Sequence, residues 1–489
     1  MKYLLLGIDG GQNEIFQRYE MPFVQSLIKK GRDLNLNADL TSRGWVEIYT
    51  GKSAIKTGGF YERPLANGCL EWSKDFKLSN IHENAADVKS LWQVLNEMGF
   101  KVGVMNVPTT NPAPQVDGFF VSGGGGGANI AEGADESQCY PSEVKKILDD
   151  LNYIVDERVP SLLWEKGLYE PEYFIDRLIL MTEKRIESFI LLTKRYQVDF
   201  GFLVLRSVVV IEFLVSGEVA RYLKGDKNIN EELIKHVFRF YRKLDELIKQ
   251  LFELLIPEQA MLVSDHGLVP RLYGVNLNNF LKKIGCQYKS DNKNSLLQLV
   301  KTFRHLIPYS VRQKLKQNKK IKSGYQSLVS FDKTKSVAFN ITQMGAIYGV
   351  YINDTVRFGG PVNLDQIESI KENIIKLFNE NVEVNEHGLK AVAYERGGHK
   401  FEYMMPDILI RMPAGYVPTN EIKQFFKKNN PSFQQINLKL VKDDNWTGAK
   451  SIDALAIECF TGNGLNREST ELPRGLTQVY EHVVNYFDI

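Results

Sequence analysis

Two carboxylates and a histidine end apolar segments of this chain, in positions where they could bind a metal ion together. Asp265 and His266 follow the apolar residues 261–263 after one serine, and Asp9 follows the apolar run 3–8. Carboxylate oxygen and imidazole nitrogen are ligands of zinc and manganese. An aspartate at the end of a strand is more often a turn former, so each residue alone indicates little. Together they predict a cation site if the two segments are neighbouring parallel strands.

A hydroxyl that could serve as a nucleophile lies in residues 40–51, LTSRGWVEIYTG. Thr41 precedes a helix-like segment, and one interpretation makes it a simple helix N-cap. The other makes it a nucleophile, because a divalent cation bound to a hydroxyl oxygen lowers the pKa of that hydroxyl. The cation, zinc or manganese, would be held by Asp9, Asp265 and His266, with Thr41 as the fourth ligand. The helix start behind Thr41 would also offer N–H groups to a phosphate.

These side chains need a scaffold in which strand ends meet, and the hydropathy pattern predicts one. Apolar runs of strand length alternate with amphipathic segments at helical spacing. This alternation is typical of an α/β fold with a mostly parallel central sheet and helices on both faces. The predicted strands are 3–8, 102–107, 199–205 and 260–263, and the predicted helices are 22–31, 92–98, 170–195 and 230–255.

We expect a single α/β domain over residues 1–489. Residues 268–345 are less regular and more basic, and they are expected to form an inserted cap over the strand ends. Strand-like segments return from residue 346 onward.

Composition is that of an ordinary globular protein. The 61 basic and 59 acidic residues leave a formal net charge of +2, so no global field favours nucleic acid as a partner. The four cysteines form no CxxC pair, which argues against a thiolate zinc site and favours a reducing compartment. No segment has the length and apolarity of a signal peptide or a membrane span, so a cytoplasmic location is expected.

Three landmarks, in this order, resemble the type I phosphodiesterase and nucleotide pyrophosphatase family of the alkaline phosphatase superfamily. They are LLLGIDGG with Asp9, Thr41 nine residues before a Thr-Gly pair, and VSDHG with Asp265 and His266. Framework segments such as SLWQVLNEMGFKVGVMNVPTTNP and MPDILI extend the likeness along nearly the whole chain. The resemblance implies an alkaline-phosphatase-like α/β/α sandwich, Thr41 as nucleophile, and Asp9, Asp265 and His266 as metal ligands.

The ligands of a second metal ion are absent. Members of this family usually hold two ions, and the second takes an Asp and a His four residues later, after the strand that is here 199–205. Those positions are Val209 and Phe213, and neither side chain can coordinate a metal. The third position, usually a His near the C-terminus, falls on Lys450, or on Ala449 if the register slips by one.

Two interpretations of this loss stay open. In the first, the chain is a phosphoesterase or phosphotransferase that uses one metal ion. Arg43 or Lys450 is then a further catalytic residue that supplies the positive charge of the missing second metal ion. In the second, it is an inactive relative that binds a metal or a partner. Retention of the Asp-His pair and Thr41 favours the first, because buried uncompensated charges cost stability. A third class, a purely structural protein, would expose an apolar patch around Val209 and Phe213.

The substrate is expected to be a phosphate ester, either a small molecule, a lipid or a glycan. Among the other histidines, His399 lies in a loop that the family places toward its active-site face. The glycines at 123–127 are not followed by the Gly-Lys-Ser/Thr of a P-loop, and they are expected to form a rim loop instead.

Overall fold

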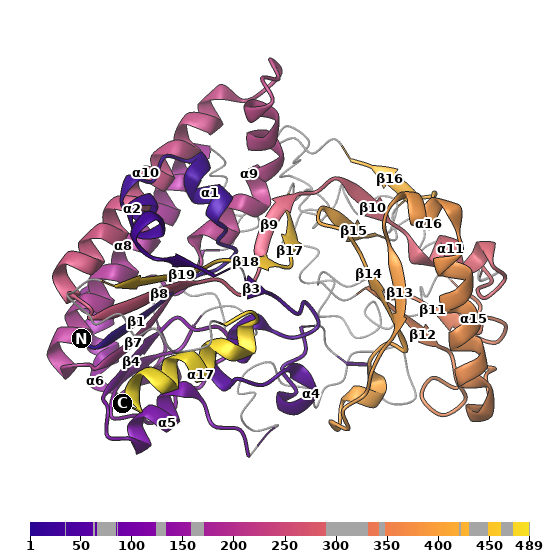
Figure 1. Ribbon diagram of the computed structural model, residues 1–489, viewed down its shortest axis with the longest axis horizontal. Coiled ribbons are helices and arrows are strands. Elements are labelled where there is room, and N and C mark those ends of the chain that lie inside the picture. Colours follow the sequence, from indigo (N-terminus) through magenta and orange to yellow (C-terminus); the bar gives the residue numbers. More distant parts are fainter. Residues whose placement is uncertain are drawn as a thin grey trace.

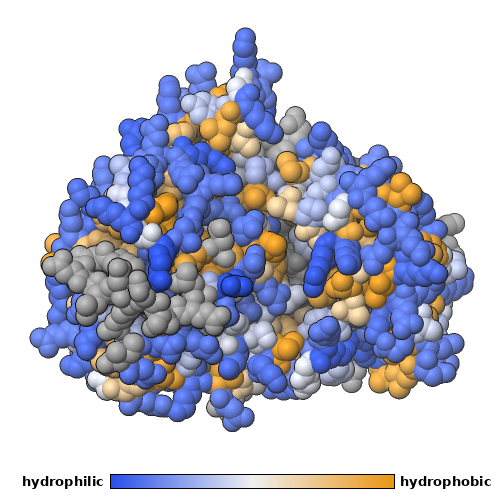
Figure 2. Space-filling model, in the orientation of Figure 1, coloured by the Kyte–Doolittle hydropathy of each residue, from blue (hydrophilic) through white to orange (hydrophobic). Residues whose placement is uncertain are grey.

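The computed structural model has two lobes that lie side by side (Figure 1). It describes residues 1–488 except 35, 62–63, 66–84, 86, 124–133, 158–170, 290–330, 342–347, 420–421, 430–447 and 461–472. The surface is largely hydrophilic and is hollowed between the lobes (Figure 2). Within the described ranges, no helix is both long enough and apolar enough to span a bilayer.

The larger lobe is built on an eight-stranded sheet in the order β2-β19-β8-β1-β7-β4-β5-β6. Its five central strands are parallel. They are β8 (Gln259–Val263), β1 (Tyr3–Ile8), β7 (Phe200–Leu205), β4 (Val102–Met105) and β5 (Gly118–Val121). The antiparallel edges are β19 (Ala456–Phe460) and β2 (Arg32–Asp33) on one side and β6 (Cys139–Tyr140) on the other. The predicted mostly parallel sheet is confirmed.

Helices cover both faces of this sheet, which confirms the predicted α/β/α sandwich (Figure 1). One face carries α2 (Pro22–Lys30), α8 (Pro171–Tyr196), α9 (Ser207–Leu223) and α10 (Glu231–Leu255). The other carries α3 (Gly44–Thr50), α5 (Leu91–Glu97) and α17 (Leu476–Phe487).

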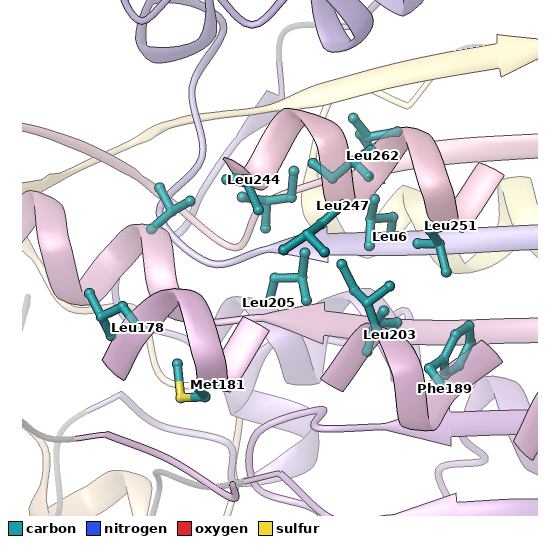
Figure 3. Packing of buried hydrophobic residues seen from close by; sticks show 14 of the residues in the cluster. Leu6, Leu178, Met181, Phe189, Leu203, Leu205, Leu244, Leu247, Leu251 and Leu262 are labelled. Atoms are coloured by element: carbon teal, nitrogen blue, oxygen red, sulfur yellow. The ribbon is translucent and has the colours of Figure 1, made fainter. Parts of the chain in front are cut away.

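Alternation along the strands supplies both cores, because successive strand side chains point to opposite faces of a sheet. In β1, Leu4 and Leu6 belong to the core under α8 and α10, whereas Tyr3 and Leu5 belong to the core under α17. Figure 3 shows strand leucines, Leu6 among them, packed against the leucines of α10.

The second lobe has its own sheet and its own core. Four strands pair antiparallel, in the order β11 (Ala338–Phe339), β12 (Gly349–Ile352), β14 (Ile408–Arg411) and β13 (Lys390–Ala393). Helices α11 (Leu277–Lys283) and α15 (Ile367–Asn379) contribute to the same apolar cluster. Beside it, β10 (Tyr273–Val275) pairs with β15 (Tyr416–Pro418) and with β16 (Phe426–Lys428).

This second lobe extends further than the insertion that composition places at about 268–345. Residues 349–352 and 408–411 join its sheet, and of the later strand-like segments only β19 reaches the central sheet. The hydropathy pattern of a strand is the same in either sheet, so it cannot assign a strand to one of them.

A buried ion-pair network stabilises the second lobe. The Arg357 guanidinium donates to the carboxylate of Asp354 and, over 2.7 Å, to that of Asp407. Arg396 donates to the other oxygen of Asp407 over 2.9 Å.

The lobes are joined by an antiparallel pair of strands, β9 (Gly267–Pro270) and β17 (Gly448–Ser451). Strand β9 starts directly after His266, and Lys450 of β17 pairs with Leu268.

Candidate metal centre and nucleophile turn

Asp9, Asp265 and His266 meet at the carboxyl ends of β1 and β8. These strands are parallel and in register, with Gly7 opposite Val263, so the residues that follow them reach the same edge of the sheet. The Ser264 hydroxyl donates to the Gly11 carbonyl over 2.9 Å and accepts the Leu455 N–H over 2.7 Å. These two bonds fix the turns that carry the candidate metal ligands.

The three side chains form a compact buried cluster. His266 Nε2 lies 3.7 Å from Asp9 Oδ1 and 3.6 Å from Asp265 Oδ2. The other ring nitrogen, Nδ1, lies 2.9 Å from the Gly267 carbonyl, which can only accept, so Nδ1 carries the proton and Nε2 offers a lone pair. Ligands about 2.0–2.2 Å from a tetrahedral ion lie about 3.3–3.6 Å apart, close to the observed separations.

Burial makes this cluster costly without a cation. The Asp265, Asp9 and His266 residues are 7%, 6% and 2% exposed, and none of the residues that the structure describes gives the buried Asp265 Oδ1 a hydrogen bond. Burial, and then the neighbouring Asp9 charge, raise the pKa of Asp265 well above its ordinary value. Burial lowers the pKa of His266 to about 3, so the imidazole is neutral and suited to bind a metal. The residues therefore fit a divalent cation such as zinc or manganese.

Thr41 lies three residues before Gly44, which packs against Asp265 of this cluster. Gly44, the first residue of α3, approaches Asp265 so closely that a Cβ on it would lie 2.5 Å from the Asp265 carbonyl oxygen. The Thr41 hydroxyl lies 2.6 and 2.7 Å from the two carboxylate oxygens of Asp39, to which it donates. The N-cap of α3 is Arg43, so Thr41 does not cap this helix. Its predicted role as nucleophile and fourth ligand remains a prediction.

A second carboxyl group lies behind this turn, on α3. Glu47 is buried, and burial, followed by the charge of Asp39, raises its pKa to about 8. A hydrogen bond with Ser42 opposes this rise. Sequence reasoning did not single out Asp39 or Glu47.

The two predicted cationic residues flank Tyr61. Lys450 Nζ lies 4.0 Å from the centre of the Tyr61 ring, and the positive charge of Lys450 lowers the pKa of both Asp265 and His266. The guanidinium of Arg43 donates to the carbonyls of Phe60 and Tyr61, each over 3.0 Å. Lys450 thus acts electrostatically on the candidate metal ligands Asp265 and His266, whereas Arg43 anchors the segment at Phe60 and Tyr61.

The positions of the missing second-metal ligands lie on α9. Val209 is 4% exposed and packs near Gly10, whose φ is +74°. Phe213 lies one turn further along the helix and is half-buried. Val209 is thus buried and part of Phe213 stays accessible, so the purely structural interpretation remains a prediction.

A positively charged side chain that the sequence did not single out, Arg206, lies beside the candidate metal ligand Asp9. Arg206, the N-cap of α9, donates through Nε to Asp9 Oδ2 over 3.2 Å and through Nη1 to Asp156. Burial lowers the pKa of Arg206, but Asp156 and Asp9 raise it more, and the net shift is upward. The only sequence signal is that Arg206 interrupts an apolar stretch at the end of a predicted strand.

The remaining candidates lie at the edge of the site or beyond the described part. The His399 ring lies 5.7 Å from that of Phe60, next to the residues bonded by Arg43. Of the glycines at 123–127, only Gly123 is among the described residues.

Comparison with known proteins gives one family. The family described as type I phosphodiesterase / nucleotide pyrophosphatase matches residues 3–432. No curated protein matches the chain.

A solved structure of phosphonoacetate hydrolase agrees in fold. Phosphonoacetate hydrolase from Sinorhizobium meliloti 1021, in complex with phosphonoacetate, is 10% identical with a TM-score of 0.56, over 100% of this chain and 96% of that chain. Murine ectonucleotide pyrophosphatase/phosphodiesterase 5 is 11% identical, with a TM-score of 0.46, over 100% and 95% of the two chains. The match over residues 3–432 makes the chain a member of the type I phosphodiesterase / nucleotide pyrophosphatase family of hydrolases, in the alkaline phosphatase superfamily.

Proposed function

We propose that this protein cleaves a phosphate ester with Thr41 as the nucleophile and a single divalent ion, zinc or manganese. The observation that carries the proposal is the buried cluster of Asp9, Asp265 and His266, in which Asp265 Oδ1 has no hydrogen-bond partner in the described part of the chain. Arg206 compensates the charge of Asp9. Asp265 pairs with no lysine or arginine of the described residues, and removing a carboxylate from water without its own cation is expensive, so a bound cation explains the cluster best.

The residues of the chain divide the chemistry between them. Asp9, Asp265 and His266 would hold the ion, which when bound supplies positive charge to the phosphate and to the attacking hydroxyl. The Thr41 oxygen attacks phosphorus, the bond from phosphorus to the leaving oxygen breaks, and the leaving oxygen takes up a proton from water. Asp39 already accepts the Thr41 hydroxyl hydrogen and, as a general base, is placed to receive the proton of that hydroxyl during the attack. Water, or an acceptor alcohol, then attacks phosphorus and releases its own proton to solvent, while the bond from phosphorus to Thr41 breaks and the Thr41 oxygen takes a proton back from Asp39.

The test pairs metal analysis with turnover. Purified protein, loaded with Zn²⁺ or Mn²⁺ and freed of excess ion, is expected to retain one ion per chain and to hydrolyse aryl phosphate monoesters or diesters. Thr41→Ala is expected to retain the ion and to lose activity by about 10³-fold or more. Acid-quenched wild-type protein should carry a phosphoryl group on the peptide that contains Thr41. Full turnover by Thr41→Ala, or two retained ions, would contradict the proposal.

A second candidate is a metal-binding protein without catalytic activity. Val209 and Phe213 favour it, because apolar packing has replaced the second set of ligands. One retained ion without turnover of any mono- or diester would support this candidate against the first.

The substrate class and location are part of the same proposal. Nucleotide, lipid and glycan phosphate esters should be compared as substrates alongside the aryl esters. The three described cysteines are free and buried, which supports a reducing compartment, and we place the protein in the cytoplasm. Fractionation of cells that express the tagged chain tests this location.

A further inference from the structure

We propose that the guanidinium of Arg206 takes the place of the second metal ion and binds the phosphoryl oxygens of the substrate. This inference rests on the proposed function and assigns the missing positive charge to a residue of the chain.

The position of Arg206 in the fold is the first argument. Arg206 is the first residue after β7 and the N-cap of α9, the helix that carries Val209 and Phe213. The guanidinium of Arg206 therefore lies at the end of β7, the strand after which the ligands of a second metal ion are missing.

The bonds of Asp9 are the second argument. Its Oδ1 faces His266 Nε2, whereas its Oδ2 accepts a hydrogen bond from Arg206 Nε. One carboxylate thus connects the metal-binding residues to a guanidinium. In a two-metal site, the two cations act as a clamp on the attacking and leaving oxygens, and Arg206 is placed to supply one half of such a clamp.

A rigid support holds the guanidinium in this place. Asp156 accepts from Arg206 Nη1, and the fully buried Arg185 lies 3.8 Å from the other oxygen of Asp156. Arg185 also donates to the Val155 carbonyl, which ties the support to the backbone. A charge donor held by fixed partners needs little reorganisation when the substrate develops charge.

Part of the Arg206 side chain remains accessible to a ligand. The Arg206 side chain keeps 18% of its surface exposed, whereas that of Asp156 keeps 1%. The Nη2 of Arg206 donates no hydrogen bond to any residue that the structure describes. A guanidinium can bind phosphate oxygens with paired N–H groups, so this accessible part suits a phosphoryl group.

The other two cations are less suited to this role. Both carbonyl bonds of Arg43 hold the segment at Phe60 and Tyr61. Lys450 lies over the Tyr61 ring and has no contact with Asp9 among the interactions of the described residues. Arg206, in contrast, bonds directly to Asp9, one of the candidate metal ligands.

The first experiment measures turnover of an aryl phosphate by metal-loaded Arg206→Ala and Arg206→Lys. We expect Arg206→Ala to lose between about 10²- and 10³-fold in kcat, the effect of removing one preorganised donor to transition-state charge. Guanidinium ion added to Arg206→Ala should restore part of the lost rate. The matched control is Arg177→Ala, which breaks a similar ion pair with Glu157 away from Asp9 and should leave kcat unchanged.

The second experiment separates this inference from the proposed function. Inorganic phosphate binding to the metal-loaded Thr41→Ala protein is measured by calorimetry, with and without Arg206→Lys. Weakening of phosphate binding by tenfold or more, at unchanged metal content, supports Arg206 as the phosphate ligand even if the Thr41 nucleophile is wrong.

Two results together would overturn the inference and leave the Thr41 mechanism intact. They are a phosphate affinity of Thr41→Ala that does not change when Arg206→Lys is added, and a kcat of the single variant Arg206→Lys within about threefold of wild type. If Arg206→Ala does not fold, Arg206→Lys decides, since it keeps a charge but loses the paired N–H groups. Retention of two metal ions by the wild-type protein would also overturn it.

Discussion

Replacing Glu47 with glutamine should change how the stability of the protein depends on pH. Glu47 is 3% exposed, and burial together with the nearby Asp39 raises its pKa from 4.5 to about 8. Glutamine keeps the size of this side chain and removes its charge. The substitution therefore isolates the cost of ionising a buried carboxyl group next to the Thr41 turn.

The sign and size of the effect follow from the two pKa values. Below pH 4.5 the carboxyl group is protonated in both the native and the unfolded protein, so its contribution does not change with pH. Between pH 4.5 and about 8 the native protein holds a proton that the unfolded chain has released, so stability falls as pH rises. The slope is about 1.4 kcal/mol per pH unit, and the total is about 4–5 kcal/mol by pH 8. Above that pH the loss is complete.

The assay is urea unfolding of the metal-free wild type and of Glu47→Gln at pH 5, 6, 7 and 8. The free energy of unfolding of Glu47→Gln minus that of wild type should increase steadily over this range. Glu97→Gln is the control, because Glu97 is exposed and pairs with Lys89 on the surface. A difference that stays constant from pH 5 to pH 8 would refute the reasoning, since Glu47 would then be ionised in the native protein throughout.

Three further changes test the site and the second lobe. Asp265→Asn should abolish retention of Zn²⁺ in metal analysis, because it removes one of two anionic ligands; retention of one ion per chain would contradict the assignment. Lys450→Gln should weaken inhibition by inorganic phosphate by no more than about threefold, because Lys450 lies over the Tyr61 ring and Arg206 is the proposed phosphate ligand, and a loss of about tenfold or more would argue for Lys450 in that role. Arg357→Met should destabilise the second lobe by about 3–5 kcal/mol in urea unfolding, because Asp354 and Asp407 lose a buried partner; a loss below about 1 kcal/mol would argue against it.

The sequence was sufficient to predict the scaffold of the site but not its full set of charges. The apolar runs at 3–8 and 260–263 have the pattern of buried parallel strands, and the aspartates that follow them meet because the strands are neighbours. The assignment of strands to the second sheet was not predictable, because strands of either sheet have the same local pattern. Only long-range packing places residues 349–352 away from the central sheet.

Arg206 and Glu47 illustrate why the remaining charges could not be predicted. In the sequence, Arg206 interrupts an apolar stretch, which indicates only that the stretch does not span a membrane. Its importance arises from Asp9 and Asp156, which lie 197 and 50 residues away along the chain. Glu47 follows the pattern of an ordinary helix residue, and its burial results from packing around α3.

The connection between the lobes has a consequence for how substrate preference could diversify. The chain leaves the larger lobe after Pro270 and returns at Gly448, and these two residues are paired neighbours on β9 and β17. An insertion whose ends are adjacent can be exchanged or shortened with little effect on the surrounding frame, because the gap is bridged by a few residues. Grafting the corresponding lobe of a relative between Pro270 and Gly448 is thus a direct way to alter ligand choice while the metal-binding strands keep their register.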